Sequence, residues 1–194
     1  VTANGAGKNV ELRANGGDLS VDNVTLDGSS DLVTLNASGA IREIGIGDAA
    51  ADITAGSLDA TAGSGIDLDT NIVILANADG GTGAIDIADA SALAVTSATT
   101  TGSITLSAGG TAQSLTIDNV SGGGTVTLTA SGAIVDDNVA GTNVTAGSLS
   151  ATASSGIDLD TDITTLTLAD GGTGAIDIED VSALAVTSAT TTGA

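Results

Sequence analysis

The chain has 194 residues and a formal net charge of −21, and it contains no aromatic residue, His, Cys, Met or Pro. Because 41% of the residues are hydrophobic, a core can form, but it must be built from Val, Ile, Leu and Ala. The acidic balance excludes a nucleic-acid partner and an anionic membrane surface, since binding to either needs Lys and Arg. The absence of His and Cys excludes the usual nucleophilic triads, and no apolar run is long enough for a membrane span.

The start of the chain carries all of its positive charge. Lys8, Arg13 and Arg42 are the basic residues, and from Glu43 onward there are none. The opening letters, "VTANGAGKNV", are not typical of a signal peptide, because they are neither basic-then-apolar nor Met-initiated. Since the repeats described next are cut at both ends, we expect an internal fragment of a longer chain.

A short phrase recurs along the chain. It is a Gly or small polar residue followed by two apolar residues that are separated by one polar residue, as in "GIDL", "AIDI" and "SITL". Such alternation predicts strands, and the segments "ADGGTG", "SAGGT" and "VSGGGT" between them predict turns. The spacing of the phrases is nearly regular, with one longer step per large unit. The first apolar residues of the phrases are Ile66, Ile85, Ile104, Val126, Ile157 and Ile176.

A longer repeat contains the short one. Thr54–Gly102 and Thr145–Gly193 align without a gap at an offset of 91 residues, and nine positions differ. Within them, the stretch "SALAVTSATTTG" is identical in both copies. We therefore expect residues 1–194 to form one continuous segment with about two copies of a unit of 91–94 residues, approximately 10–103 and 104–194.

Two all-β architectures fit this pattern: tandem β-sandwich domains and a β-solenoid. The short period favours the solenoid, because stacked coils repeat like residues, whereas a sandwich has no reason to do so. We predict a parallel β-solenoid of nine or ten coils, in which one short period of about 19–22 residues makes one coil. One internal ladder is expected to contain Ile66, Ile85, Ile104, Ile157 and Ile176. A neighbouring ladder is expected to contain Leu68, Ile87 and Leu106.

The best candidates for catalysis are paired carboxylates. Asp67 and Asp69, with their counterparts Asp158 and Asp160, have a pattern that glycoside hydrolysis could use. However, they alternate with apolar residues, as expected for the solvated side of a strand. Polysaccharide lyases with a β-helical fold generally need a basic residue at the sugar, and none follows Arg42. We predict that the chain is not an enzyme and has no catalytic residue.

Calcium is the one cofactor for which the sequence contains a candidate motif. The phrase "GGTGAIDI", at Gly80 and Gly171, resembles the calcium-binding nonapeptide, but Ile85 and Ile176 occupy the place of its Asp. The Asp comes one residue later, and in a strand one residue reverses the direction of a side chain. We predict a turn into a strand, no metal or cofactor site, and at most diffuse, weak Ca²⁺ binding.

Four Asn-x-Ser/Thr triplets are expected by chance in a chain this rich in Asn, Ser and Thr. Two of them recur in the same "DNV" context, which favours a role in turns or stacking. The triplets begin at Asn23, Asn36, Asn119 and Asn143.

The whole chain resembles the repeat region of filamentous haemagglutinin and of the large exoproteins of two-partner secretion, together with autotransporter passengers. Phrases such as "TTTGSITLSAGG" and "SGGGTVTLTASGAI" are typical of that group. The resemblance implies a right-handed parallel β-helix, export across the outer membrane of a Gram-negative bacterium, and a rod-like adhesin or surface filament. An adhesin stalk, a self-assembling filament and a calcium-dependent repeat adhesin remain open.

The expected partners are further copies of the same repeat. An open solenoid end presents unpaired backbone donors and acceptors, and natural solenoids protect such ends with atypical coils. The sequence shows no such cap. We therefore expect a continuous rod, joined covalently to further repeats or stacked end to end. The net charge of −21 should oppose lateral bundling. Other parts of a longer chain would contact host or neighbouring cells.

Overall fold

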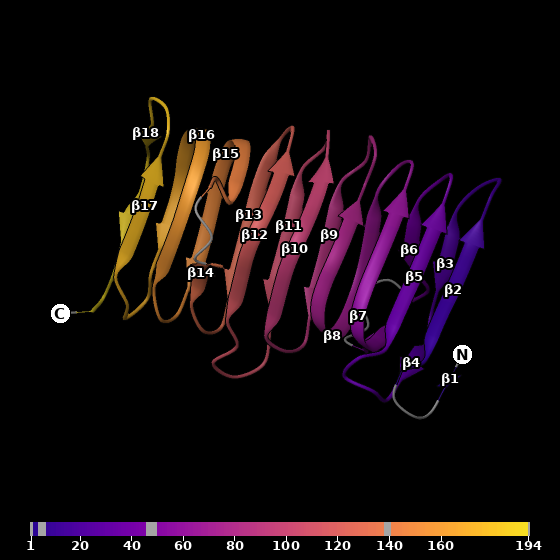
Figure 1. Cartoon of the computed structure of the whole chain (residues 1–194). Helices are drawn as coiled ribbons and strands as arrows, with labels where there is room; N and C mark the ends of the chain where they lie inside the picture. The colour runs from indigo at the N-terminus through magenta and orange to yellow at the C-terminus, as the bar shows by residue number, and fades with distance from the viewer. Residues whose placement is uncertain (1, 4–6, 46–49, 138–140, 194) are drawn as a thin grey trace.

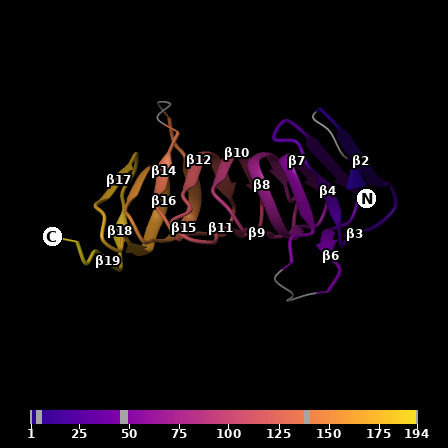
Figure 2. The ribbon, with the colours of Figure 1, turned by 90° about the horizontal axis from the view of Figure 1, so that it is seen from below.

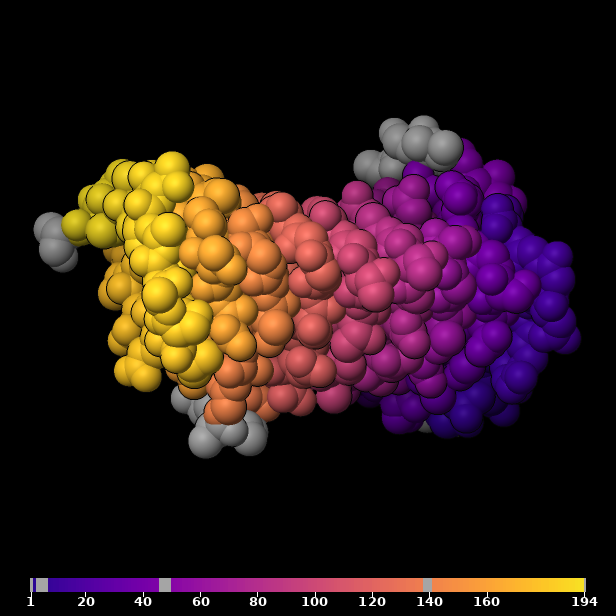
Figure 3. All heavy atoms as spheres, turned by 90° about the horizontal axis from the view of Figure 1, so that it is seen from above, coloured from indigo at the N-terminus to yellow at the C-terminus, as the bar shows by residue number. Residues whose placement is uncertain are grey.

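The computed structural model describes residues 2–3, 7–45, 50–137 and 141–193. It is an all-β solenoid of about nine turns, in which parallel strands stack along one axis (Figure 1). Figure 3 shows an elongated solid body with the N-terminal residues at one end and the C-terminal residues at the other. Among the described residues there is no helix long and apolar enough to cross a bilayer. The predicted fold class is thus confirmed, and tandem sandwiches are ruled out.

The strands form two broad layers, seen edge-on in Figure 2, which we call face 1 and face 2. Face 1 contains β2 (Asn9–Ala14), β5 (Leu32–Ala37), β10 (Leu93–Thr100), β12 (Leu115–Gly122), β14 (Ile134–Asp136) and β17 (Ile176–Asp180). Face 2 contains β3 (Leu19–Val21), β6 (Ile41–Glu43), β9 (Ile85–Asp89), β11 (Ile104–Ala108), β13 (Thr125–Ala130), β18 (Ala185–Val186) and β19 (Ala189–Thr190).

Four long strands bend at an edge of the rod, so that their two ends lie on different sides. They are β7 (Ile53–Ala62), β8 (Ile66–Asp79), β15 (Val144–Ala153) and β16 (Ile157–Asp170). The first part of β8 pairs with β6 and β9 on face 2, and its second part pairs with β7 and β10 on face 1. A third, short side holds β1 (Thr2–Ala3) and β4 (Val24–Leu26), and β4 also pairs with the start of β7.

The core is a set of ladders of small apolar side chains. Along each strand, buried and outward residues alternate, as in the pattern of Ile104–Ala108. Because neighbouring coils are in register, each buried side chain contacts its equivalent above and below, and each fully buried Ile or Leu contributes about 2 kcal/mol. The predicted ladder of first apolar residues is confirmed for β8, β9 and β11. The neighbouring ladder is confirmed as well: Leu68, Ile87 and Leu106.

The prediction that Ile157 and Ile176 continue the first ladder is wrong. The ladder continues from Ile104 to Val126, Leu149 and Leu166 on face 2. Ile157 and Ile176 instead stack on Ile134 and Leu115, which belong to face 1.

The physical reason is that one long repeat makes four and a half coils. Leu58 lies on face 1, and the chain crosses half a coil to reach Ile66 on face 2. Four whole coils then lead from Ile66 to Leu149, the residue equivalent to Leu58. Each copy of the long repeat is therefore turned by half a revolution relative to the one before it. Two copies give nine coils and restore the original facing.

The coils are also less uniform than expected. The step between stacked residues is shorter than the predicted range from Leu58 to Leu75, and it is longer than that range from Ile41 to Ile66. The predicted coil length therefore describes only the more regular coils, such as those that stack Ile66, Ile85 and Ile104.

Candidate functional site

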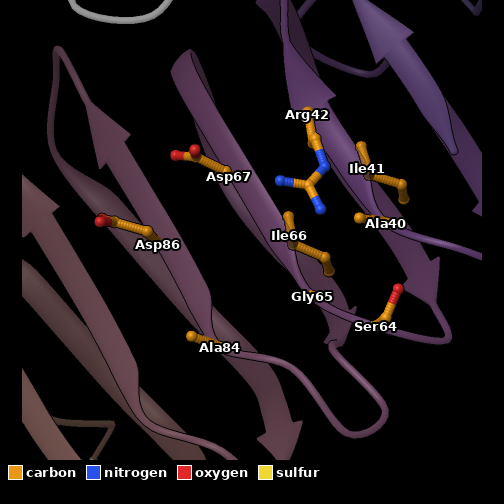
Figure 4. A pocket seen from close by; sticks show the side chains of 9 residues that line it. All are labelled: Ala40, Ile41, Arg42, Ser64, Gly65, Ile66, Asp67, Ala84 and Asp86. Atoms are coloured by element: carbon orange, nitrogen blue, oxygen red, sulfur yellow. The ribbon is translucent and has the colours of Figure 1, made fainter.

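A row of charged side chains lies on the outer surface of face 2. Arg42, Asp67 and Asp86 occupy the same position on three successive coils, and all three are exposed. They line a hollow of about 290 Å³ together with small residues such as Ser64 and Ala84 (Figure 4). Burial raises the pKa of Asp86, and the carboxylates of Asp67 and Glu43 raise it further. The row therefore places two carboxylates, of Asp67 and Asp86, next to one guanidinium group, of Arg42.

A second acidic row lies on face 1. Asp158 stacks beneath Asp177, in the place that Asp67 and Asp86 take in the first copy. Burial raises the pKa of Asp158, and so do the nearby carboxylates of Asp136, Asp177 and Asp160. Because of the half-turn between copies, the two rows point to opposite sides of the rod.

Asp69 and Asp160 differ in exposure from Asp67 and Asp158, their partners in the predicted pairs. The backbone N–H of Asp69 donates to Asp52 Oδ2 at 3.2 Å, and that of Asp160 donates to Asn143 Oδ1 at 3.0 Å. Both side chains are half-buried, whereas Asp67 and Asp158 are exposed. The structure thus puts each pair on the same outward side of its strand, as alternation predicts, and no Lys or Arg occurs in the part of the sequence that forms the second row.

A buried polar cluster that was not predicted from the sequence lies around Asp89. At the edge of the rod, Asp89 is buried and accepts four hydrogen bonds. Thr70 Oγ1 and Ile72 N donate to Oδ2 at 2.7 and 2.8 Å, while Ser91 N and Oγ donate to Oδ1 at 2.8 and 2.9 Å. We call this cluster the polar corner. It ties the bend of β8 to the next coil.

The polar corner recurs in the second copy around Asp180. Thr161 Oγ1 and Ile163 N donate to one carboxylate oxygen at 2.9 and 3.0 Å, and Ser182 N and Oγ donate to the other at 2.9 and 3.1 Å. Burial by itself would raise the pKa of Asp180, but these hydrogen bonds outweigh it and lower the pKa. The polar corner therefore has a structural role, because both carboxylate oxygens already accept hydrogen bonds from within the chain.

The turn "GGTG" precedes a strand, as predicted. Asp79 Oδ1 accepts a hydrogen bond from Gly81 N at 2.9 Å, and Gly81 has a φ of +57°, which favours glycine. A Cβ on Gly83 would lie 2.1 Å from the carbonyl oxygen of Ser64 on the coil below. Ile85 then points into the core and Asp86 points out. In the described part of the chain, no group of three or more acidic side chains is arranged to hold a metal ion.

Two of the four Asn triplets show defined contacts. Asn143 is buried, and its Nδ2 donates to the carbonyl oxygen of Ile117 at 3.1 Å, so its side chain joins stacked coils. Asn23 Oδ1 accepts a hydrogen bond from Thr25 Oγ1 at 2.8 Å.

A sequence signal for the polar corner exists in the repeat. Thr70 and Asp89 are separated by one short period, as are Thr161 and Asp180, and each Asp is followed by Ser at the second position after it. Alternation places Thr70 and Asp89 on the inward side of their strands, and two inward polar residues one coil apart indicate a hydrogen bond between stacked coils.

Comparison with protein-family models, with curated proteins and with solved structures gave no match. The functional argument therefore depends on the fold and its surfaces.

Proposed function

We propose that the chain is a structural repeat segment of a bacterial cell-surface or secreted adhesin or filament. It acts as a rod-like stalk or fibre body and performs no catalysis. The single observation that carries the proposal is the parallel stacking of the core ladders over about nine turns. Such a stack resists bending and can be extended by adding coils, since each coil contacts only its neighbours.

The composition supports the same function. The phrases resemble those of filamentous haemagglutinin, whose group exports rods of this kind to the cell surface. A net charge of −21 keeps a long rod soluble and separate from its neighbours. The absence of Cys suits a rod that has no need of disulfides. The proposed location is extracellular or on the outer membrane of a Gram-negative cell.

The location is tested by immunogold electron microscopy of the source cells with an antibody against this chain. The expected result is label on filaments or fibrils outside the outer membrane. Label confined to the cytoplasm would refute the proposal. Label along the whole fibre would favour a filament body, and label between a cell-proximal anchor and a distinct tip would favour an adhesin stalk.

The absence of catalysis is tested with the two carboxylates of the second acidic row that resemble a glycosidase pair. The wild-type chain and the double variant Asp158→Asn with Asp160→Asn are incubated with acidic and neutral polysaccharides. We expect no product from either protein and the same circular dichroism spectrum for both. Turnover that is lost in the double variant would overturn the proposal.

A calcium-dependent adhesin is the second candidate, and the stacked carboxylates of the two acidic rows favour it. Melting temperature is followed during titration with CaCl₂, with NaCl at equal ionic strength as the control. We expect the two salts to act alike, because exposed carboxylates are screened by either cation. A large rise with CaCl₂ alone would establish the calcium-dependent function instead.

A further inference from the structure

Face 2 carries a regular group of hydroxyl side chains on three successive coils. Along β11, β13 and the second part of β15, each buried residue alternates with an outward Ser or Thr. Because the three strands pair in register, the outward residues of one coil lie beside those of the next. Two complete rows run across the coils, and we call them the hydroxyl array. They are Thr105, Thr127 and Ser150 in one row, and Ser107, Thr129 and Thr152 in the other.

The hydroxyl array is uncharged, although the chain as a whole is strongly acidic. No Asp, Glu, Lys or Arg occurs in β11, β13 or β15, whereas the net charge of the chain is −21. The half-turn between the long repeats explains this, because it places the second acidic row on face 1. The coils on either side, which contain β9 and β16, bring the carboxylates of Asp86 and Asp170 to the borders of the array.

The side chains of the array are directed outward at fixed positions. Their hydroxyl groups make no hydrogen bond within the described part of the chain. In a neighbouring row, the hydroxyl oxygens of Thr125 and Ser148 lie 2.9 Å apart, so side chains of successive coils point the same way. Thr is also stiff at χ1, because its Cβ is branched. The array therefore presents its hydroxyl groups in a set arrangement on the outer surface of the sheet.

The spacing of the array is periodic in two directions. Successive coils are about 4.8 Å apart, and alternate residues of one strand are about 6.6 Å apart. A ligand that contacts both rows on all three coils must itself repeat in both directions. An ionic lattice meets no opposite charge here, and a crystalline glycan meets no aromatic ring on which a sugar could stack. Ice fits these conditions, because its surface is an uncharged lattice of water oxygens with repeats close to both spacings.

We propose that the hydroxyl array binds the surface of ice. Each hydroxyl takes the place of a surface water molecule, since it donates one hydrogen bond and accepts others as water does. The methyl groups of the Thr side chains lie between these positions and exclude liquid water from the contact. This activity goes beyond the proposed function as a rod, and it gives the rod a surface that adheres to ice.

The first experiment follows the purified chain while ice grows slowly from its solution, and it also measures the thermal hysteresis of that solution. We expect the chain to be enriched in the ice and to lower the freezing point below the melting point. An unrelated soluble protein, which growing ice excludes, is the reference. A chain that stays in the liquid and gives no thermal hysteresis would overturn the proposal.

The second experiment places a bulky side chain at the centre of the array. Thr127→Tyr raises a ring above the plane of the hydroxyl groups, and Tyr suits a strand, so the fold should be retained. The matched control is Thr116→Tyr, because Thr116 is an outward, half-buried Thr on β12 of face 1. We expect Thr127→Tyr to lose both enrichment in ice and thermal hysteresis, and Thr116→Tyr to keep both. Equal behaviour of the two variants, with unchanged circular dichroism spectra, would overturn the proposal.

Smaller changes test the array without a bulky residue. Thr127→Ser keeps the hydroxyl but removes the methyl group and the stiffness at χ1, so thermal hysteresis should fall. Ser107→Thr with Ser150→Thr makes both rows entirely Thr, so thermal hysteresis should rise. If neither variant changes thermal hysteresis, or if the two changes have the opposite signs, the array is not the surface that binds ice.

A third measurement separates ice from a crystalline glycan. The wild type and Thr127→Tyr are mixed with microcrystalline cellulose above the freezing point, and we expect neither to bind. Binding to cellulose that Thr127→Tyr loses, without enrichment in ice, would assign the array to a glycan and overturn the proposal. Label on surface filaments of the cells, together with no enrichment in ice, would reject ice binding and leave the rod function standing.

Discussion

The same twelve letters occur at two places in this molecule and behave differently. In Ser91–Gly102 they form the continuous strand β10, and Val95 is 2% exposed. In Ser182–Gly193 they form only the two short strands β18 and β19, and Val186 is 56% exposed. The sequence is identical, so the difference comes from the neighbours. β10 lies between two coils, and the second copy has a coil on one side only within the described residues.

The comparison shows that a strand here is a property of the stack. These residues have high β-propensity in both places, but the backbone of β18 and β19 lacks partners on its outer edge within the part of the chain that the structure describes. The local sequence favours a strand, but the full strand forms only where a neighbouring coil pairs with it on each side. The same substitution made at equivalent positions of the two copies can therefore separate the effect of the local sequence from the effect of the neighbouring coils.

The largest difference is expected for Val95→Asp against Val186→Asp. A carboxylate at position 95 would be buried in an apolar ladder and should cost about 4 kcal/mol or more. At position 186 it stays in water, and the cost in dilute, monomeric protein should be below about 0.5 kcal/mol. Urea denaturation followed by circular dichroism measures both. Equal effects would mean that the last coil is covered in solution.

Gly83→Ala and Gly174→Ala should instead have equal effects. In each case a Cβ would lie 2.1 Å from a carbonyl oxygen of the coil below, Ser64 or Ser155, and both copies have that lower coil. We expect each to cost about 3 kcal/mol, because backbone must move. Gly147→Ala, whose nearest atom is at 3.5 Å, is the control and should change the unfolding free energy little. A smaller cost at Gly174 would show that the end coil is loosely seated on its lower neighbour too.

The two polar corners should differ by an intermediate amount. Asp89→Asn places an amide N–H₂ against groups that already donate, in a buried site, and should cost about 2 kcal/mol. Asp180→Asn makes the same change at a half-exposed site and should cost about 1 kcal/mol. Thermal melting at neutral pH measures the difference, with Asp162→Asn, which points outward, as the control.

The pH dependence of the second copy should separate Asp180 from Asp158. The pKa of Asp180 is lowered, so its contribution to stability is present above the unfolded-state pKa, about 3.9, and is lost as the pH falls through the folded-state value. The pKa of Asp158 is raised, so protonation there favours the folded state as the pH falls. Asp180→Asn should flatten the loss of stability in acid. Asp158→Asn should give a slight stabilisation at neutral pH, and destabilisation there would contradict the repulsion between the stacked carboxylates.

Much of the fold could be predicted from the sequence. Alternation predicted the strands, and the equal steps between successive phrases predicted that Ile66, Ile85 and Ile104 stack. The position of Ile157 could not be predicted in this way, because a repeat length counts residues and not coils. Its face depends on where β8 and β16 bend and on the long coils that precede them. The lengths of those coils depend on packing at the edges of the rod, and the repeated phrase carries no information about that packing.

The candidate site was predicted less completely. The outward direction of Asp67 and Asp158 follows from alternation alone. The polar corner was missed although alternation places Thr70 and Asp89 on the inward side of β8 and β9, because the sequence alone does not show that stacking brings their side chains within hydrogen-bond distance. The partial exposure of Ile176 at the end of the rod was missed for the same reason, since its sequence context is that of a buried residue.

Because each long repeat turns the chain by half a revolution, the side that a given unit faces depends on whether an odd or an even number of units precedes it. A rod with an odd number of units has its first and last acidic rows on the same side, and a rod with an even number, such as the two units of this chain, has them on opposite sides. Gain or loss of one unit would change the length by only four and a half coils, yet it would reverse the direction in which everything beyond it points. Two units added together would lengthen the rod and leave that direction unchanged, so insertions in pairs preserve the orientation of whatever the rod carries.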